Sequence, residues 1–210
     1  AVNTLIHDRE IPDAAEYLIF LRETGVDAVL FQDVGLASLA REVVPALPLH
    51  ASTQMTIHNR PGLEWAASLG ISRVVLAREL SLAEVEAMGE TARRLGIGIE
   101  IFTHGALCYS YSGQCLLSSA IGGRSGNRGR CAQPCRRPYG LVRGGSDEYG
   151  RPRRLTTVPL GERYLLSTRD LSLYPFLDRV VRAPVGALKI EGRMRSPEYV
   201  AVVTGICRRA

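Results

Sequence analysis

A strand and a helix alternate at nearly constant spacing through the first hundred residues, and this repeat limits the chain to very few folds. Short β-branched segments begin at residues 2, 27, 49, 73 and 98, which lie 25, 22, 24 and 25 residues apart. Such alternation requires parallel strands joined by right-handed crossovers. The predicted strands are Val2–Ile6, Asp27–Phe31, Leu49–Thr53, Arg73–Ala77 and Gly98–Phe102, and the predicted helices are Ile11–Glu23, Leu36–Val44, Gly62–Leu69 and Ser81–Leu95.

Two α/β architectures contain such repeats, an open doubly wound sheet and a (β/α)8 barrel. The even spacing and the absence of a Gly-x-Gly-x-x-Gly turn after the first strand favour the barrel. We therefore predict a TIM-barrel-like domain. The sequence starts without Met and stops within a helical pattern, so we expect the barrel to be incomplete at both ends.

The repeat breaks after the fifth strand and resumes near the C-terminus. Four segments follow from this: βα repeats over 1–104, a Cys- and Arg-rich loop over 105–143, a hairpin tip over 144–163, and a return to the barrel over 164–210. The hairpin is predicted from a Gly-rich stretch, Gly144–Gly150, between two β-type segments, Tyr139–Val142 and Arg163–Leu166. In the last segment we expect a helix over Leu171–Leu177, a strand over Ala187–Ile190 and a helix from Pro197 capped by Ser196.

Positive charge is concentrated in one part of the chain. Between residues 122 and 154 there are nine Arg against Asp147 and Glu148, a net charge of +7, whereas the whole chain carries +5 and the remainder therefore −2. A local basic segment favours an anionic partner such as RNA phosphate or a small dicarboxylate, although a solvated loop is the alternative. The arginines predicted to bind substrate are Arg124, Arg128, Arg130, Arg136 and Arg193.

Four of the five cysteines lie within 28 residues, at positions 108, 115, 131 and 135. Thiolates clustered in a Gly-rich segment are typical of a soft-metal site. Disulfides suit small secreted scaffolds rather than a fold with a large core. Structural zinc is an alternative, but only Cys131-x3-Cys135 resembles its usual spacing. An iron–sulfur cluster tolerates irregular spacing better and is ranked first; Cys207, in an apolar helical pattern, is interpreted as a small buried residue.

Polar residues follow the predicted strands, where the carboxyl ends of a βα fold form the active site. We name four of them as candidate catalytic residues: His50, Gln54, His104 and Glu191. Tyr109, Tyr111 and Tyr139 could stack on a single-stranded base, although packing is the alternative for each. The longest apolar runs are far shorter than the ~20 residues of a membrane span, so we expect a cytoplasmic protein without a membrane partner.

Two stretches around the first cysteines carry a recognisable pattern. Residues 100–108, Glu-Ile-Phe-Thr-His-Gly-Ala-Leu-Cys, are followed after four residues by Gly-Gln-Cys-Leu-Leu-Ser at 113–118. This resembles the signature of the collagenase-like peptidase family U32. The segments 49–55, 73–80, 122–136 and 188–194 are similar to the family as well.

The resemblance implies chemistry beyond proteolysis. Members of the family include oxygen-independent hydroxylation factors that form 5-hydroxyuridine at the tRNA wobble position, hydroxylate a 23S rRNA cytidine or hydroxylate ubiquinone precursors. They hold a [4Fe-4S] cluster on four cysteines, which by motif are Cys108, Cys115, Cys131 and Cys135 here. For the RNA members the hydroxyl group derives from prephenate, the expected co-substrate.

The sequence is compatible with three functions. RNA hydroxylation is preferred over quinone chemistry because the loop is basic, and no residue decides between tRNA and rRNA. A peptidase could use Cys108 with His104 as base, but a cysteine that ligates a cluster cannot also attack a peptide. The third possibility is a non-catalytic RNA-binding or assembly subunit with a structural cluster. The oligomeric state is not predicted.

Overall fold

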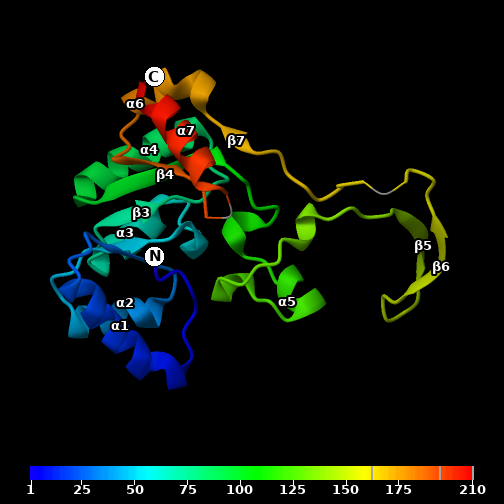
Figure 1. Ribbon diagram of the computed structural model, residues 1–210, viewed down its shortest axis with the longest axis horizontal. Coiled ribbons are helices and arrows are strands. Elements are labelled where there is room, and N and C mark those ends of the chain that lie inside the picture. The colour runs from blue at the N-terminus through cyan, green and yellow to red at the C-terminus, as the bar shows by residue number, and fades with distance from the viewer. Residues whose placement is uncertain (162, 194, 210) are drawn as a thin grey trace.

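The computed structural model describes residues 1–161, 163–193 and 195–209; Glu162, Met194 and Ala210 lie outside the described residues. Figure 1 shows an α/β body and a long arm that leaves it and returns. The helices of the body are α1 (Ile11–Glu23), α2 (Val34–Val43), α3 (Arg60–Ser68), α4 (Leu82–Leu95), α5 (Leu117–Gly122), α6 (Leu177–Arg182) and α7 (Pro197–Arg209). The strands are β1 (Val29–Phe31), β2 (Leu49–Ala51), β3 (Arg73–Val75), β4 (Gly98–Gly105), β7 (Leu171–Ser172) and β8 (Ala187–Ile190), with β5 (Val142–Ser146) and β6 (Pro152–Thr157) on the arm.

The central sheet confirms the predicted α/β class. Strands β1, β2, β3, β4 and β8 pair in parallel in that order, and β7 adds an antiparallel pair at the end of β4. In the described part of the chain the sheet stays open, so the closed barrel that the strand spacing predicted is not seen there. The chain places its parallel strands side by side in sequence order up to β4, as consecutive βα units do.

One face of the sheet carries the hydrophobic core. The register aligns Val29 with Leu49 and Ala51 with Val74, and each of these side chains is at most 2% exposed. Residues from the first four helices join the same cluster, among them Leu18, Leu36, Leu63 and Met88. Because successive side chains of a strand point to opposite faces, the residues between these core positions lie on the other face.

The helix ends follow local sequence rules. The Ser81 side chain accepts a hydrogen bond from the backbone N–H of Glu84 while the Glu84 carboxylate accepts one from the N–H of Ser81, which together form a capping box. Gly96 ends the same helix in the left-handed conformation, at φ 69°. Asp33 caps α2 by accepting from the N–H of Leu36 at 2.9 Å.

Two element predictions were wrong in detail. The segment Val2–Ile6 makes a single bridge, from Val2 to Phe31, because the N–H of Leu5 is bonded to the cysteine loop at Asn127 O instead. The predicted helix Leu171–Leu177 is replaced by β7, a 3-10 turn (Tyr174–Phe176) and the start of α6. The N–H of Leu173 donates to Thr103 O at 2.9 Å, so pairing with β4 overrides the local helical pattern.

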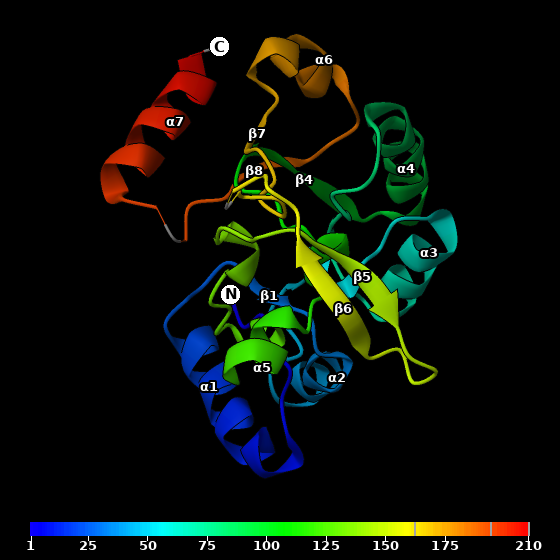
Figure 2. The ribbon, with the colours of Figure 1, turned by 90° about the vertical axis from the view of Figure 1, so that its right-hand side faces the viewer.

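The hairpin is present, but β5 begins only at Val142, the last residue of one predicted strand, and β6 lies inside the predicted tip. β5 and β6 pair in antiparallel fashion from Val142–Thr157 to Ser146–Pro152, and the turn spans residues 147–151. The arm is an antiparallel ribbon that carries the hairpin far from the sheet (Figure 1). Figure 2, seen along the arm, shows β5 and β6 in front of the body. Within the described residues, no helix combines the length and apolar character needed to cross a membrane.

Candidate cysteine and arginine site

The four clustered cysteines lie on the irregular loop between β4 and the arm. Cys108 follows β4, Cys115 precedes α5, Cys131 follows the 3-10 turn Gly126–Arg128, and Cys135 lies in the 3-10 turn Pro134–Arg136. All are free thiols, three of them half-buried and Cys131 exposed. Burial raises the pKa of the Cys135 thiol; Arg136 lowers it, and the other three thiols raise it further. The other three thiols are therefore close enough to Cys135 to affect its pKa.

Backbone N–H groups point at two of the sulfur atoms. The N–H of Leu117 lies 3.4 Å from Cys115 Sγ, and the N–H of Gln133 lies 3.3 Å from Cys131 Sγ. Such contacts stabilise thiolate ligands and tune the potential of a cluster. Among the described residues, no group of three or more Cys, His, Asp or Glu is arranged to hold a single metal ion.

The first part of the loop is fastened to the end of β3. The buried Ser112 donates its backbone N–H to Glu79 Oε1 at 2.7 Å and its hydroxyl to the other carboxylate oxygen. The Ser112 oxygen in turn accepts from the N–H of Arg78 at 3.2 Å. Ser112 adopts φ 42°, a left-handed conformation held by these bonds. The loop between Cys108 and Cys115 is thereby set against the carboxyl edge of the sheet.

Gln54, a predicted catalytic residue, also holds the loop. It lies in the 3-10 turn Thr53–Met55 after β2, and its side chain contacts Asn3 and, at 3.4 Å, Asn127 Oδ1. Its backbone carbonyl accepts from the Gln114 side chain. Both polar atoms of the Gln54 side chain are engaged, one by Asn3 and the other by Asn127, which indicates a positioning function.

Arg136 joins both ends of the arm to the loop. One guanidinium nitrogen donates to Ser167 Oγ at 2.9 Å and to the Thr168 carbonyl, and the other donates to the Leu107 carbonyl at 2.7 Å. Leu107 precedes Cys108, and Arg136 itself follows Cys135. Arg136 therefore fixes two cysteine-bearing segments relative to each other, rather than standing free for a substrate.

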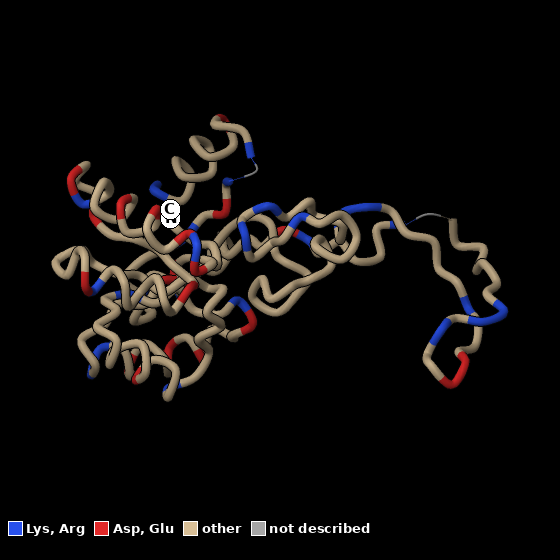
Figure 3. Tube along the Cα trace, turned by 90° about the horizontal axis from the view of Figure 1, so that it is seen from below, with Lys and Arg blue, Asp and Glu red and all other residues tan. Residues whose placement is uncertain are grey.

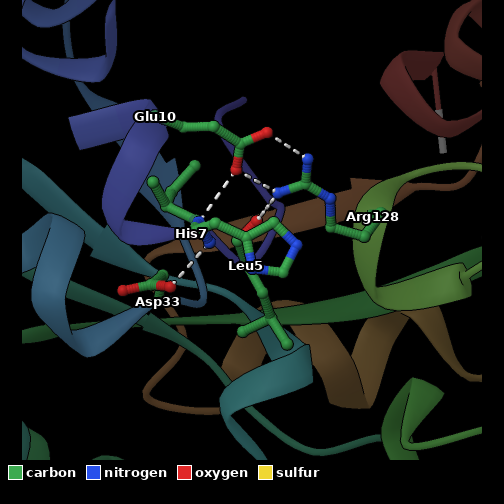
Figure 4. Close-up of polar contacts among 6 residues, drawn as sticks. Leu5, His7, Glu10, Asp33 and Arg128 are labelled. Carbon is green, nitrogen blue, oxygen red and sulfur yellow. Dashed lines mark hydrogen bonds and ion pairs between the residues drawn. The ribbon is translucent and has the colours of Figure 1, made fainter. Parts of the chain in front are cut away.

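Arg128 is likewise engaged within the protein. Its guanidinium forms a two-pronged ion pair with Glu10, one of whose oxygens lies 2.7 Å from Nη1, and also donates to the Leu5 carbonyl (Figure 4). The hydrogen bond from Arg128, followed by that from the His7 backbone N–H, lowers the pKa of Glu10 to about 2. The N–H of Ile6 donates to Asp33 in the same cluster.

The other predicted arginines differ in their surroundings. Arg124 Nε donates to the Arg130 carbonyl at 3.1 Å. Arg128 and Arg130 line a polar pocket of about 200 Å³ together with Thr4, Gly123 and Ser125. Arg193 is exposed after β8. Of the five predicted substrate arginines, Arg130 and Arg193 are thus the two whose side chains donate no hydrogen bond to another described residue.

The face of the sheet opposite the core carries a charged row. His50 on β2 is aligned with Arg73 on β3, and the buried Glu100 on β4 lies 2.9 Å from Lys189 and 3.8 Å from Arg73. Burial lowers the pKa of His50, and Arg73 and Lys189 lower it further while Glu100 raises it. His50 therefore lies within a network of charges.

His104 and Glu191 meet where β4 and β8 end. The N–H of Glu191 donates to the His104 carbonyl at 2.9 Å, and the His104 ring lies 6.0 Å from the Tyr199 ring. A Cβ atom on Gly105 would come within 2.6 Å of Glu191 O, so only glycine allows this approach. Of the predicted tyrosines, Tyr139 donates its hydroxyl to Pro134 O, whereas Tyr111 and Tyr109 are 48% and 57% exposed. Tyr111 makes an edge contact with the His58 ring at 6.0 Å.

Sequence reasoning missed several residues that organise the site. Glu100 and Lys189 were not named as candidate site residues, although charged residues in mid-strand are a signal that one face of the sheet is polar. Glu79 and Ser112 gave no comparable signal, because their contact joins residues 33 positions apart.

The sequence pattern of peptidase family U32 matches residues 1–210, the whole chain. The chain belongs to peptidase family U32. The resemblance seen at residues 100–118 is therefore confirmed.

Three relatives illustrate the range of names in the family. The chain is 39% identical over 208 residues to the 23S rRNA 5-hydroxycytidine C2501 synthase of Escherichia coli (strain K12), covering 99% of this chain and 29% of that protein. It is 34% identical to tRNA hydroxylation protein P1 of Bacillus subtilis (strain 168), covering 99% and 47% respectively. It is 35% identical to a collagenase of Porphyromonas gingivalis (strain ATCC BAA-308 / W83), covering 96% and 48%. The chain thus spans less than half of each of these relatives.

Proposed function

We propose that this U32 chain is part of an enzyme that hydroxylates RNA without oxygen, acting on a tRNA wobble uridine or a 23S rRNA cytidine. The observation that carries the proposal is the similarity, over almost the whole chain, to proteins named for tRNA and 23S rRNA hydroxylation. The hydroxyl group would derive from prephenate, a dicarboxylate. The protein would work in the cytoplasm, where these RNAs are found.

We further propose a [4Fe-4S] cluster on Cys108, Cys115, Cys131 and Cys135. Four free thiols on one loop, with N–H groups directed at Cys115 and Cys131, are a donor set suited to a cluster. Their irregular spacing favours a cluster over zinc, because cluster ligands surround a larger object. When bound, such a group supplies electron transfer or structural support.

The residues around the cysteines have distinct proposed functions. Arg136, Gln54 and the Glu79–Ser112 pair hold the loop in place. Arg130 and Arg193 are proposed to contact anionic groups of the RNA or of the dicarboxylate, since a guanidinium binds either with paired hydrogen bonds. His50 within β2, and His104 and Glu191 at the ends of β4 and β8, remain candidate catalytic residues.

Peptidase activity is the second candidate, because a relative 35% identical is named collagenase. It would need Cys108 as a nucleophile activated by His104. The His104 ring packs near Tyr199, and the structure gives no hydrogen bond between His104 and Cys108 among the described residues. A cluster ligated by Cys108 would exclude this chemistry.

Metal analysis tests the cofactor. The protein, purified without air, should contain about four irons and matching sulfide per chain, and Cys131→Ala should lose them. Cys207→Ala is the matched control, since Cys207 lies in α7 away from the loop. One zinc per chain, or unmetallated thiols that react with iodoacetamide and cleave a gelatin substrate, would refute the cluster and favour the peptidase.

The RNA substrate is tested by nucleoside analysis of a strain that lacks the gene. Loss of a 5-hydroxyuridine derivative from tRNA identifies the wobble uridine as the substrate, and loss of hydroxycytidine from 23S rRNA identifies the cytidine. Loss of neither would refute RNA hydroxylation.

A further inference from the structure

The hairpin on the arm packs against no other element of the described chain. Every residue of β5 and β6 is exposed. An isolated two-stranded ribbon is marginally stable in water and buries no core that would help the body. Figure 1 shows it at the far end of the arm. Its contribution to the protein is therefore to be sought outside the α/β body.

The hairpin nevertheless has a defined shape. The Asp147 carboxylate accepts from the N–H of Tyr149 at 3.0 Å and of Arg151 at 2.8 Å, which closes the turn. Arg154, at φ 51°, forms a bulge opposite Gly144. A Cβ atom on Gly144 would lie 2.7 Å from Arg153 O, so the strands approach as closely as glycine permits.

The bulge sorts the side chains into two faces. Gly145 pairs with Arg153, and Arg143 pairs with Thr156, so Arg143 and Arg153 project from one face. Leu155 lies beside Gly144 on the opposite face, together with Val142. One face of the ribbon is therefore basic, and the other carries exposed apolar side chains, 54% and 49% exposed.

Charge on the hairpin is mostly positive. Residues 142–157 contain four arginines, at positions 143, 151, 153 and 154, and two acidic residues, Asp147 and Glu148, which gives a net charge of +2. Figure 3 shows basic residues along the arm and an acidic tip. Among the described residues of the hairpin, one ion pair joins Arg153 to Asp147 at 3.7 Å. The Arg153 side chain is 72% exposed, so this pair is weak. The arginines remain available to a partner.

The base of the arm is tied to the cysteine loop. Arg136 bonds to Ser167 and Thr168 on the returning strand, and the Tyr139 hydroxyl donates to Pro134 O at 2.9 Å. Tyr139 and Arg163 exchange backbone hydrogen bonds of 2.8 and 3.1 Å just beyond this point. A polyanion lying along the ribbon would be led toward Cys135.

We infer that the β5–β6 hairpin is an RNA-binding arm whose Arg143 and Arg153 face contacts backbone phosphates, independently of sequence and away from the modified base. This inference rests on the proposed function, which makes RNA the polyanion. Phosphate contacts by arginine fix the position of a protein on nucleic acid without reading its sequence. The basic ribbon extends the footprint of the protein beyond the cysteine loop.

The salt dependence of binding tests the inference. Affinity for bulk tRNA and for 23S rRNA, both from a strain lacking the gene, is measured against salt concentration with the natural full-length protein and with R143Q/R153Q. Each lost phosphate contact lowers the slope of log K against log salt by about 0.7 to 0.9. The double variant should therefore lower the slope by about 1.4 to 1.8 on either RNA, because contacts to backbone phosphates do not depend on sequence.

The matched control is R93Q/R182Q, which removes two exposed arginines from α4 and α6. It should leave the slope unchanged. An equal fall of the slope in both variants would show that RNA responds only to the overall surface charge. An unchanged slope in R143Q/R153Q would show that the hairpin arginines do not contact RNA. Either result overturns the inference. Circular dichroism checks that both variants are folded.

Failure of the arm and failure of the proposed function give different results. If the wild-type gene restores the hydroxylated nucleoside to the deletion strain while R143Q/R153Q keeps the full salt slope, the hairpin does not bind RNA, but the proposed hydroxylase function is supported. If the salt slope depends on the hairpin arginines but the deletion strain loses no hydroxylated nucleoside, the hairpin binds RNA and the proposed hydroxylase function is refuted.

Discussion

Arg136 is the residue whose loss should most disturb the geometry of the cysteine loop. Its guanidinium makes three hydrogen bonds, to Leu107 O, Ser167 Oγ and Thr168 O. Bonds to a charged donor contribute about 1.5 to 3 kcal/mol each, and the residue is half-buried, so water replaces part of them in Arg136→Ala. The Leu107 carbonyl also keeps its bond from Thr168 Oγ1 at 2.8 Å. A local loss of about 2 kcal/mol is the balance of these effects.

Amide hydrogen exchange measures this loss directly. The Ala132 N–H, bonded to Ser118 Oγ at 2.9 Å, and the Tyr139 N–H, bonded to Arg163 O at 2.8 Å, report on the loop and the arm. Their exchange should accelerate by about 30-fold, the equivalent of 2 kcal/mol, while the N–H of Val29 in the core is unaffected. Arg137→Ala removes the same charge from the exposed neighbouring position and should change neither. Equal effects of the two substitutions, or none from Arg136→Ala, would refute the assigned function of Arg136.

Three further predictions follow from single contacts. Gly105→Ala should lower the Tm by roughly 6 °C or more, because Gly105 has φ 113° and the new Cβ atom would collide with Glu191. Gly145→Ala should leave the Tm unchanged, because an added Cβ atom there meets nothing within 4 Å. The Glu10–Arg128 contact lowers the pKa of Glu10 from 4.5 to about 2, so it contributes stability above pH 4.5 that is lost as the pH falls toward 2; a pH series of urea unfolding should show this loss, and Glu10→Gln should abolish it. His50 should titrate by NMR below 6.5, and Glu100→Gln should lower its pKa further, since Glu100 is the group that raises it; a midpoint above 6.5 would contradict the burial of His50.

The sequence predicted the elements that local pattern controls. Strands β1 to β4 and helices α1 to α4 lie within the predicted repeats, because hydrophobic periodicity and caps such as Ser81 and Gly96 are local. It failed where a distant partner decides. Leu171–Leu177 has a helical pattern, but pairing of Leu173 with Thr103 on β4 makes it a strand and a turn. Closure of the sheet into a barrel, which the strand spacing predicted, is not seen in the described residues.

The candidate site was predicted in composition but not in detail. The cysteines and arginines were found because their clustering is visible in the sequence. Which arginines are free was not, since Arg128 pairs with Glu10 from 118 positions away and Arg136 with Leu107 and Thr168 from 29 and 32 positions away. Only the folded chain shows that these two arginines stabilise the loop rather than bind a ligand.

Complementation of a deletion strain with cysteine variants tests the central claim most directly. Nucleosides from total tRNA and 23S rRNA are compared by mass spectrometry in cells carrying the wild-type gene, Cys131→Ala or Cys207→Ala at equal protein level. A cluster-dependent RNA hydroxylase predicts that one nucleoside loses the mass of an oxygen atom in the deletion strain and in Cys131→Ala, and regains it with the wild type and Cys207→Ala. An unchanged nucleoside profile in the deletion strain, or full restoration by Cys131→Ala, would contradict the account.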